Sequence, residues 1–304
     1  MDDISRLLRM ARLDATLDKR CLLAASTRME VDAMGEREVP FHVLLEGECQ
    51  LEVGGVLITM RAGDVVVIPS GSGHRVITDG VGAVRPTTER QGQTFALTSS
   101  DGGGHPVIDL FCGHYTVGAG AGAMLFASLP TPTHVSLFRS QDGRDLLTGL
   151  SSLMRSEATH DGAGSAAIMS AFCTVLMALV LRTPARGGAN SLLWTAVSEP
   201  RMSEIVRLIL DDPGADWSID RLSRRSSMSR ATFIRHFQAA TGMTFGRFLG
   251  RARLMTAADQ LMATDLSVAA IAAAVGFRSE SAFARAFRAE IGETPARFRR
   301  SQAE

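Results

Sequence analysis

The cysteines are the side chains of this 304-residue chain with the most distinctive chemistry, and they stand at positions 21, 49, 112 and 173. Residues 1–6 are acidic and contain no apolar secretory run, so we expect a cytoplasmic protein. Cytoplasmic thiols are kept reduced, which argues against structural disulfides. The cysteines are therefore expected to bind a metal, to react with oxidants or to pack as small apolar side chains.

Cys112 and His114 lie two residues apart in a segment, residues 107–117, whose pattern predicts a strand. Side chains two apart on a strand share one face, so a thiol and an imidazole are expected side by side. Cys49 lies in a strand-like alternation and Cys173 in an apolar helical run. For these last two cysteines we predict core packing.

The elements that must position these side chains are mainly strands over residues 1–120. Residues 48–53 alternate between apolar and polar, turn at Gly54-Gly55 and return over residues 57–60. Residues 78–105 are rich in glycine, serine and threonine without periodicity, which predicts a mobile loop.

Two short motifs in this region resemble those of the cupin family. Residues 63–74 match the second cupin motif, G-x5-P-x-G-x2-H, at every defined position through His74. Residues 40–46 resemble the first, H-x-H-x3-E, with Pro40 where the first histidine should be. The resemblance implies a small β-barrel. The proline removes one usual metal ligand, which argues against a cupin dioxygenase.

Near the C-terminus the sequence predicts two short helices joined by a tight turn. Ser267 is placed to cap the first helix, Gly276 can take the positive φ that ends it, and Ser279 caps the second. Phe283 and Phe287, four residues apart, lie on the inner face of that second helix. A capped helix with a polar outer face after a tight turn fits the major groove of DNA.

The same plan occurs once more, earlier in the chain. Ser218 and Ser229 are expected to cap its two helices, and Phe233 and Phe237 repeat the buried pair. Residues 245–262 are helical in pattern, and a long stiff helix there would set the spacing between the two units.

Residues 198–301 resemble the DNA-binding domain of the AraC/XylS family of bacterial transcription regulators. The positions at the family's spacing are Gly276-Phe277, Ser279, Phe283, Phe287, Gly292, Thr294-Pro295 and Phe298-Arg299. The resemblance implies a homodimer that binds double-stranded promoter DNA and works with RNA polymerase. It also implies the residues that face DNA, which are Arg230, Ala231, Ile234 and Arg235 in the first unit and Arg278, Glu280, Ser281 and Arg285 in the second.

Charge distribution agrees with a DNA-binding C-terminus. The chain is neutral overall, with 32 basic and 32 acidic residues. Residues 201–304 hold 16 arginines, no lysine and 11 acidic residues, a net charge of +5, so residues 1–200 carry −5. A basic end on an acidic body is typical of a DNA-binding domain attached to a sensor.

The resemblance also implies a site inside the barrel. His42 and His74 fall on cupin positions that face the interior, and one branch of these regulators pairs an N-terminal cysteine with one on a late strand, as Cys21 and Cys112 do. Some members of that branch respond to oxidants. If the four side chains converge, they form a Cys2His2 set suited to Zn²⁺, with His114 as a reserve ligand. Alternatively, all are buried core residues. Cys21, ahead of the first barrel strand, would be free to close over the opening.

Residues 142–181 predict two helices, the second apolar nearly all round. We expect them to form the dimer contact, or alternatively to pack within one chain. Residues 165–183 are short for a membrane span, contain serine and threonine and lack an aromatic belt, so we predict a buried interface helix and no membrane partner. Residues 183–190 are the expected linker.

Together these observations predict an α+β protein in three parts. Residues 1–125 form a cupin-like sensor domain, residues 126–190 a helical dimerisation segment with a linker, and residues 191–304 a DNA-binding domain with two helix-turn-helix units. The predicted function is that of a transcription regulator, not an enzyme, that senses a metal, thiol oxidation or a small effector. The alternative is a cupin-type metal-dependent isomerase or oxygenase that carries a helical tail.

Overall fold

The computed structural model describes residues 3–11, 13–35, 37–117, 126, 129–139, 141–160, 162–183, 200–241 and 243–301. The chain divides into two compact units. The barrel unit comprises residues 13–117 and 130–186, and the helical unit comprises residues 1–12, 118–129 and 187–304. This division differs from the three parts expected from the sequence, because the helical segment after residue 130 groups with the barrel and the first twelve residues group with the C-terminal helices.

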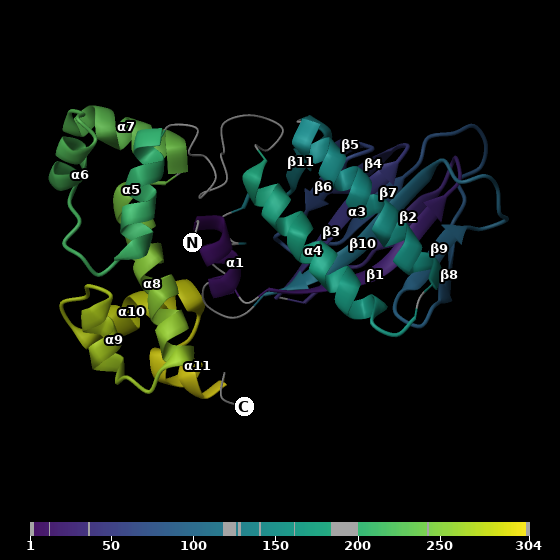
Figure 1. Ribbon diagram of the computed structural model, residues 1–304. Coiled ribbons are helices and arrows are strands. Elements are labelled where there is room, and N and C mark those ends of the chain that lie inside the picture. Colours follow the sequence, from purple (N-terminus) through teal and green to yellow (C-terminus); the bar gives the residue numbers. More distant parts are fainter. Residues whose placement is uncertain are drawn as a thin grey trace. The chain divides into compact units, whose positions relative to one another are not determined.

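The barrel unit is built from two sheets that enclose a core (Figure 1). The larger sheet has the order β11-β6-β3-β10-β1-β9-β8, and the smaller sheet has the order β2-β7-β4-β5. The strands are β1 (Asp14–Leu23), β2 (Arg28–Val31), β3 (Glu38–Glu46), β4 (Glu48–Val53), β5 (Val56–Arg61), β6 (Asp64–Val67), β7 (His74–Ile77), β8 (Thr87–Gln91), β9 (Ala96–Ser100), β10 (Ile108–Thr116) and β11 (Thr133–Ser136). A 3-10 turn, η1 (Leu137–Arg139), follows β11.

Side chains from both sheets fill the interior of the barrel. Leu44, Val66 and Leu110 come from the larger sheet and Leu51 and Val76 from the smaller one, and all five are fully buried. Cys21 and Cys112 belong to the same core cluster. Alternation along each strand thus directs one side-chain row inward, as a small barrel requires.

The segment expected as a mobile loop contains a β-hairpin instead. β8 pairs antiparallel with β9, and β9 pairs parallel with β1 over residues 96–99. The prediction was wrong because β8 is an edge strand whose side chains are nearly all exposed. Without one buried face, the strand carries no apolar alternation in its sequence.

Two helices follow the barrel strands, as predicted. They are α3 (Gln141–His160) and α4 (Ser165–Arg182). The Tyr115 hydroxyl of β10 donates to the Cys173 carbonyl oxygen of α4 at 2.7 Å, and both side chains are buried. Within the described residues, α4 is the one helix long and apolar enough to cross a membrane, and 44% of that window is buried inside the structure. Most of the expected linker, beyond Thr183, lies outside the described residues.

The helical unit contains both predicted helix-turn-helix units. Its helices are α1 (Asp3–Ala11), α5 (Pro200–Asp211), α6 (Ile219–Arg225), α7 (Arg230–Thr241), α8 (Phe245–Ala263), α9 (Val268–Ala274), α10 (Glu280–Ile291) and α11 (Pro295–Ser301). The pairs α6–α7 and α9–α10 lie toward opposite ends of α8 (Figure 1). At ~1.5 Å per residue, the 19 residues of α8 span ~28 Å.

Capping explains where these helices begin and end. The hydroxyls of Ser218, Ser267 and Ser279 accept backbone N–H bonds at the starts of α6, α9 and α10. Gly276 and Gly292 take positive φ angles of 84° and 91° after α9 and α10. These caps confirm the boundaries that the sequence predicted.

Candidate sensor site and DNA-binding surface

Cys21 and Cys112 lie on neighbouring strands of the larger sheet, with their sulfurs 3.5 Å apart. Both thiols are free and buried. Leu17 of β1 pairs with Gly113 of β10, whereas Lys19 pairs with Cys112, so the register shifts between residues 17 and 19. This bulge turns the odd-numbered side chains that follow it, including Cys21, to the same face as Cys112. Cys21 is therefore a sheet residue inside the core, and the expectation that it closes over the opening from outside was wrong.

His42 links this cysteine pair to the smaller sheet. It lies on β3 directly opposite Cys112, and its Nδ1 atom is 3.1 Å from the Cys112 Sγ atom. Its Nε2 atom is 2.6 Å from the Nε2 atom of His74 on β7. The Nδ1 atom of His74 is 2.9 Å from the carbonyl oxygen of Ser72. We call Cys21, Cys112, His42 and His74 the cysteine–histidine chain.

The interior environment favours the neutral forms of these groups. Burial raises the pKa of the Cys112 thiol well above its usual value, and the contact with Cys21 raises it further. Burial also lowers the pKa of His42 well below its usual value, with smaller contributions from His74 and Lys19. The pKa of His74 is lowered by burial as well. A neutral Cys112 thiol therefore faces a neutral His42 imidazole in the reduced protein.

The remaining cysteines and histidine take other roles. His114 bonds to Asp18 at 2.9 Å, a contact that raises its pKa. It therefore has a partner of its own rather than a place in the cysteine–histidine chain. Burial raises the pKa of both Cys49 and Cys173 to about 12, which agrees with their predicted packing role. One neighbour escaped the sequence analysis: the Met29 sulfur lies 3.5 Å from the Cys21 sulfur, and an apolar side chain gives no signal of such a contact.

The side chains expected to touch DNA are all exposed on the helical unit. Four lie on or beside α7 (Arg230, Ala231, Ile234 and Arg235) and four on or beside α10 (Arg278, Glu280, Ser281 and Arg285). Ile234 exposes 42% of its surface, so this apolar side chain is accessible for contact. Arg230 is held 3.0 Å from Asp220, so it is less free than Arg235 to contact a base.

Comparison with known proteins agrees with both parts of this description. The Cupin family profile matches residues 2–185, and a Helix-turn-helix domain profile matches residues 222–301. The chain is an AraC-family transcription regulator with an N-terminal cupin domain.

Relatives match along the whole chain. An uncharacterized HTH-type transcriptional regulator of Haemophilus influenzae is 29% identical over 99% of both chains. The RCS-specific HTH-type transcriptional activator RclR of Escherichia coli is 27% identical over 98% of this chain and 97% of its own. A solved structure, the DNA-binding domain of AdpA in complex with a target DNA, is 33% identical over 33% of this chain and 91% of its own, with a TM-score of 0.33.

The cupin domain of this regulator departs from a metal-binding cupin at the side chains that would hold the ion. Pro40 has no ligand atom, and Glu46 bonds to Arg155 at 3.3 Å. The four side chains of the cysteine–histidine chain follow one another in a line, because one ring nitrogen of His42 contacts Cys112 and the other contacts His74. A tetrahedral ion needs four donors that converge on one point. Among the described side chains, no three of His, Cys, Asp or Glu are so placed. As arranged, these residues do not fit Zn²⁺, and the zinc site stays a prediction.

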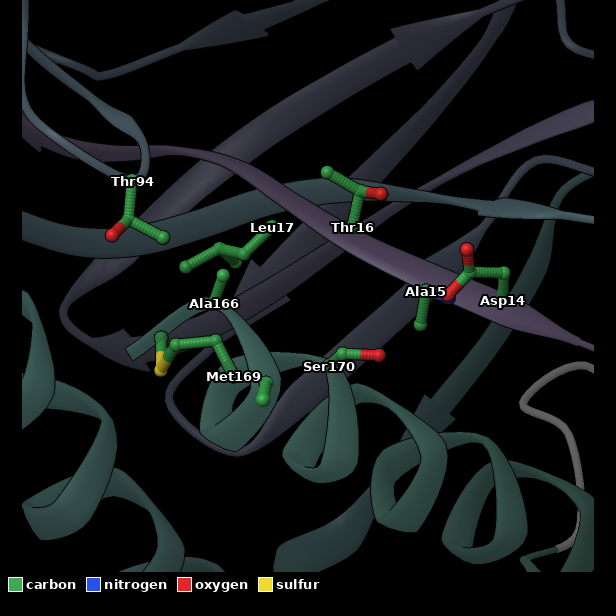
Figure 2. A pocket seen from close by; sticks show the side chains of 9 residues that line it. Asp14, Ala15, Thr16, Leu17, Thr94, Ala166, Met169 and Ser170 are labelled. Atoms are coloured by element: carbon green, nitrogen blue, oxygen red, sulfur yellow. The ribbon is translucent and has the colours of Figure 1, made fainter. Parts of the chain in front are cut away.

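Pockets open on the barrel unit of this AraC-family regulator, and two of them bear on the candidate site. One, of about 400 Å³, has His74 in its wall together with Glu30, Asp32, Glu52 and Arg75. The other, of about 350 Å³, lies between β1 and α4 (Figure 2). The second pocket is lined by small and polar side chains such as Thr16, Thr94 and Ser170, with Met169 on the helix side.

Proposed function

We propose that this regulator binds promoter DNA through α7 and α10 and that its cupin domain senses oxidation of the Cys21–Cys112 pair. The observation that carries the proposal is the 3.5 Å distance between two reduced, buried sulfurs on adjacent strands. A disulfide has an S–S length of ~2.05 Å, so its formation draws the sulfurs together by ~1.5 Å. Because protein interiors are close-packed and transmit strain, we expect part of this shift to reach β1 and β10.

The outer face of the same strands offers a route from the thiols to the helices. Arg20 precedes Cys21, and Asp109 precedes Cys112 by three residues; the two bond to each other at 2.9 Å. Arg155 of α3 bonds to the same Asp109 carboxylate at 2.7 Å. Movement of β1 against β10 therefore acts on α3. The sensor can control DNA binding if the reduced and oxidised forms differ in this contact.

Exposure of the residues on α7 and α10 supports DNA binding by two recognition helices. Arg235 and Arg285 can form paired hydrogen bonds with guanine, and Ala231 and Ile234 can contact thymine methyl groups. We also propose that the regulator is a homodimer in which α4 forms the contact. Exposed or half-buried apolar side chains recur along α4 at helical spacing; they are Ile168, Ala171, Phe172 and Val175. Work with RNA polymerase remains an expectation from the family.

The test is a reporter assay in cells treated with a mild oxidant. The double variant Cys21→Ser, Cys112→Ser is expected to lose the response, because it cannot form the bond. The matched control Cys49→Ser, Cys173→Ser changes the two packing cysteines and is expected to respond as the parent does. An unchanged response in the first variant would reject thiol sensing. The pocket of about 350 Å³ between β1 and α4 would then be the candidate site for a small organic effector.

A further inference from the structure

The cysteine–histidine chain has a direction that its hydrogen bonds determine. The Ser72 carbonyl oxygen can only accept, so the His74 Nδ1 atom at 2.9 Å must carry a proton and donate it. A neutral His74 then presents a bare Nε2 atom to His42. The His42 Nε2 atom, 2.6 Å away, must therefore donate, which leaves its Nδ1 atom as an acceptor. The remaining partner of that acceptor is the Cys112 thiol at 3.1 Å.

We propose that His42 is the proton acceptor for Cys112 and that His74 holds His42 in position and accepts its Nε2 proton. Cys112 is therefore the sulfur that attacks the oxidant, and Cys21 then attacks the oxidised Cys112 to form the disulfide. This inference rests on the proposed thiol-sensing function. Cys21 has no comparable base among the described contacts, because its sulfur meets only the sulfurs of Met29 and Cys112. Two cysteines in one core are thus made unequal by a single imidazole.

The cysteine–histidine chain also provides a path by which a buried thiol can lose its proton. A thiolate is the reactive form of cysteine, yet Cys112 is only 4% exposed. A proton leaving Cys112 can pass to the His42 Nδ1 atom while the His42 Nε2 proton passes to His74. The positive charge then rests on His74, in the wall of a pocket that also holds Glu30, Asp32 and Glu52. Burial lowers the pKa of His74, and the hydrogen bond from its Nδ1 atom to the Ser72 carbonyl oxygen opposes that effect.

The charged side chains near the cysteine–histidine chain already have partners of opposite charge. Lys19 of β1 lies near both thiols, and its ammonium group bonds to Glu89 at 2.8 Å. Asp18 of β1 is held by His114 of β10. Arg75 of β7, beside His74, faces Glu30 and Glu52 at 3.5 and 3.6 Å. With these groups paired, His42 is the base in direct contact with Cys112.

With hydrogen peroxide as the oxidant, the reaction balances in two steps. The Cys112 sulfur takes a hydroxyl group from the peroxide and the O–O bond breaks. The departing hydroxide takes up, from the His42 Nδ1 atom, the proton that the thiol gave to that ring, and it leaves as water. Cys112 is then a sulfenic acid. The Cys21 sulfur attacks it, the S–O bond breaks, and the Cys21 proton leaves with that hydroxyl group as a second water. Two thiols are oxidised to one disulfide, and one peroxide is reduced to two waters.

The hydrogen-bond direction is tested without any variant. NMR of full-length, reduced protein labelled with ¹⁵N-histidine reports which ring nitrogen carries the proton. We expect protonated Nε2 on His42 and protonated Nδ1 on His74. The opposite tautomer on either ring would overturn the proposal. So would one equivalent of zinc per chain in protein purified without chelator, because His42 would then be a ligand.

The unequal roles of the sulfurs are tested by trapping. Purified Cys21→Ser protein is treated with hydrogen peroxide and dimedone and analysed by mass spectrometry. We expect sulfenic acid on Cys112 there, and far less on Cys21 in the Cys112→Ser protein at the same dose. Similar labelling of the two cysteines, or labelling of Cys21 alone, would overturn the assignment.

The role of His42 is tested in the Cys21→Ser background. General-base assistance is typically worth 10²–10⁴-fold, so we expect His42→Asn to slow Cys112 oxidation by about 100-fold and to change its pH profile. His105→Asn, at an exposed histidine, is the matched control and should leave both unchanged. A lower rate with the parent pH profile would mean that His42 is only structural. If His42→Asn fails to fold, His74→Gln replaces it, with a smaller slowing and a changed profile expected. If these experiments support the proton relay but the Cys21→Ser, Cys112→Ser variant responds to oxidant in the reporter assay as the parent does, the proposed function is rejected and this inference stands.

Discussion

The guanidinium group of Arg20 grips both carboxylate oxygens of Asp109, with its Nε and Nη2 atoms each 2.9 Å from an oxygen. This pair ties β1 to β10 on the outer face of the sheet, next to the two cysteines on the inner face. Asp109 is 5% exposed and also accepts from Arg155 of α3 at 2.7 Å. One carboxylate therefore joins both thiol-bearing strands to the helix that follows them.

Removal of this carboxylate should destabilise the barrel unit. Asp109→Ala leaves Arg20 and Arg155 without their shared partner. Because both pairs are only partly buried, we expect a loss of about 2 kcal/mol, less than for a fully buried pair. Urea unfolding of the variant and the parent measures the difference. Asp101→Ala, at an exposed aspartate, is the control and should change the free energy of unfolding by less than about 0.5 kcal/mol. A similar value for Asp109→Ala would show that the arginine network contributes little.

Substitution of the recognition arginines should weaken binding to the specific operator selectively. Arg235→Ala and Arg285→Ala each remove an exposed guanidinium group from α7 or α10, at a cost of about 1–3 kcal/mol on an operator selected from random DNA. Fluorescence anisotropy on operator and scrambled duplexes measures the two affinities. The control is Arg207→Ala, which removes an arginine of α5 that pairs with Asp211 and lies outside α7 and α10. Equal losses on both duplexes would identify phosphate contacts instead.

The spacing of the two contacts on DNA should be strict. The stiff helix α8 separates the two helix-turn-helix units, so we expect α7 and α10 to enter successive major grooves ~34 Å apart on one face of the duplex. Inserting ~5 base pairs between the half-contacts turns one of them to the opposite face and should abolish tight binding. An insertion of a full turn is the comparison. Unchanged affinity after the half-turn insertion would mean that only one unit docks.

The pairing of His114 with Asp18 should contribute stability at low pH. The hydrogen bond to Asp18 raises the pKa of His114 above its usual value near 6.5, so the folded state binds this proton more tightly than the unfolded state. The stabilisation is complete below the unfolded pKa and is lost as the pH rises through the folded pKa. The stability difference between the parent and His114→Gln should shrink over that range. His105→Gln controls for loss of an exposed histidine, and a difference that grows with pH would contradict the assignment.

Charges on α4 should disrupt the proposed dimer. Ile168 and Val175 are 39% and 37% exposed and lie seven residues apart on one face of the helix. Ile168→Asp with Val175→Asp puts two carboxylates into an apolar contact, where they would be desolvated without partners. Light scattering after size exclusion should report a monomer. The control Thr174→Asp adds a charge at another exposed position of α4, and a dimer in both variants would place the contact elsewhere.

Much of the helical unit was predictable because its signals are local. Ser267, Gly276 and Ser279 mark helix ends through bonds to residues no more than four positions away, and the structure confirms them. The cupin motifs are equally local, with Gly63 and Gly71 at the positive φ angles that their turns require. Such features depend on the types of a few neighbouring residues, so the sequence alone indicates them.

The arrangement of the cysteine–histidine chain depended on contacts between distant strands. Leu17 and Cys21 are both odd-numbered residues of β1, and the register shift near Asp18 decides that Cys21 faces Cys112 instead of the outer face. Donor types predicted a tetrahedral metal site, whereas the pairing of β3 with β10 sets His42 between Cys112 and His74. Side-chain type and spacing therefore determined which residues could do chemistry. Strand register across the barrel decided which atoms meet, because it is set by the packing of segments far apart in the chain.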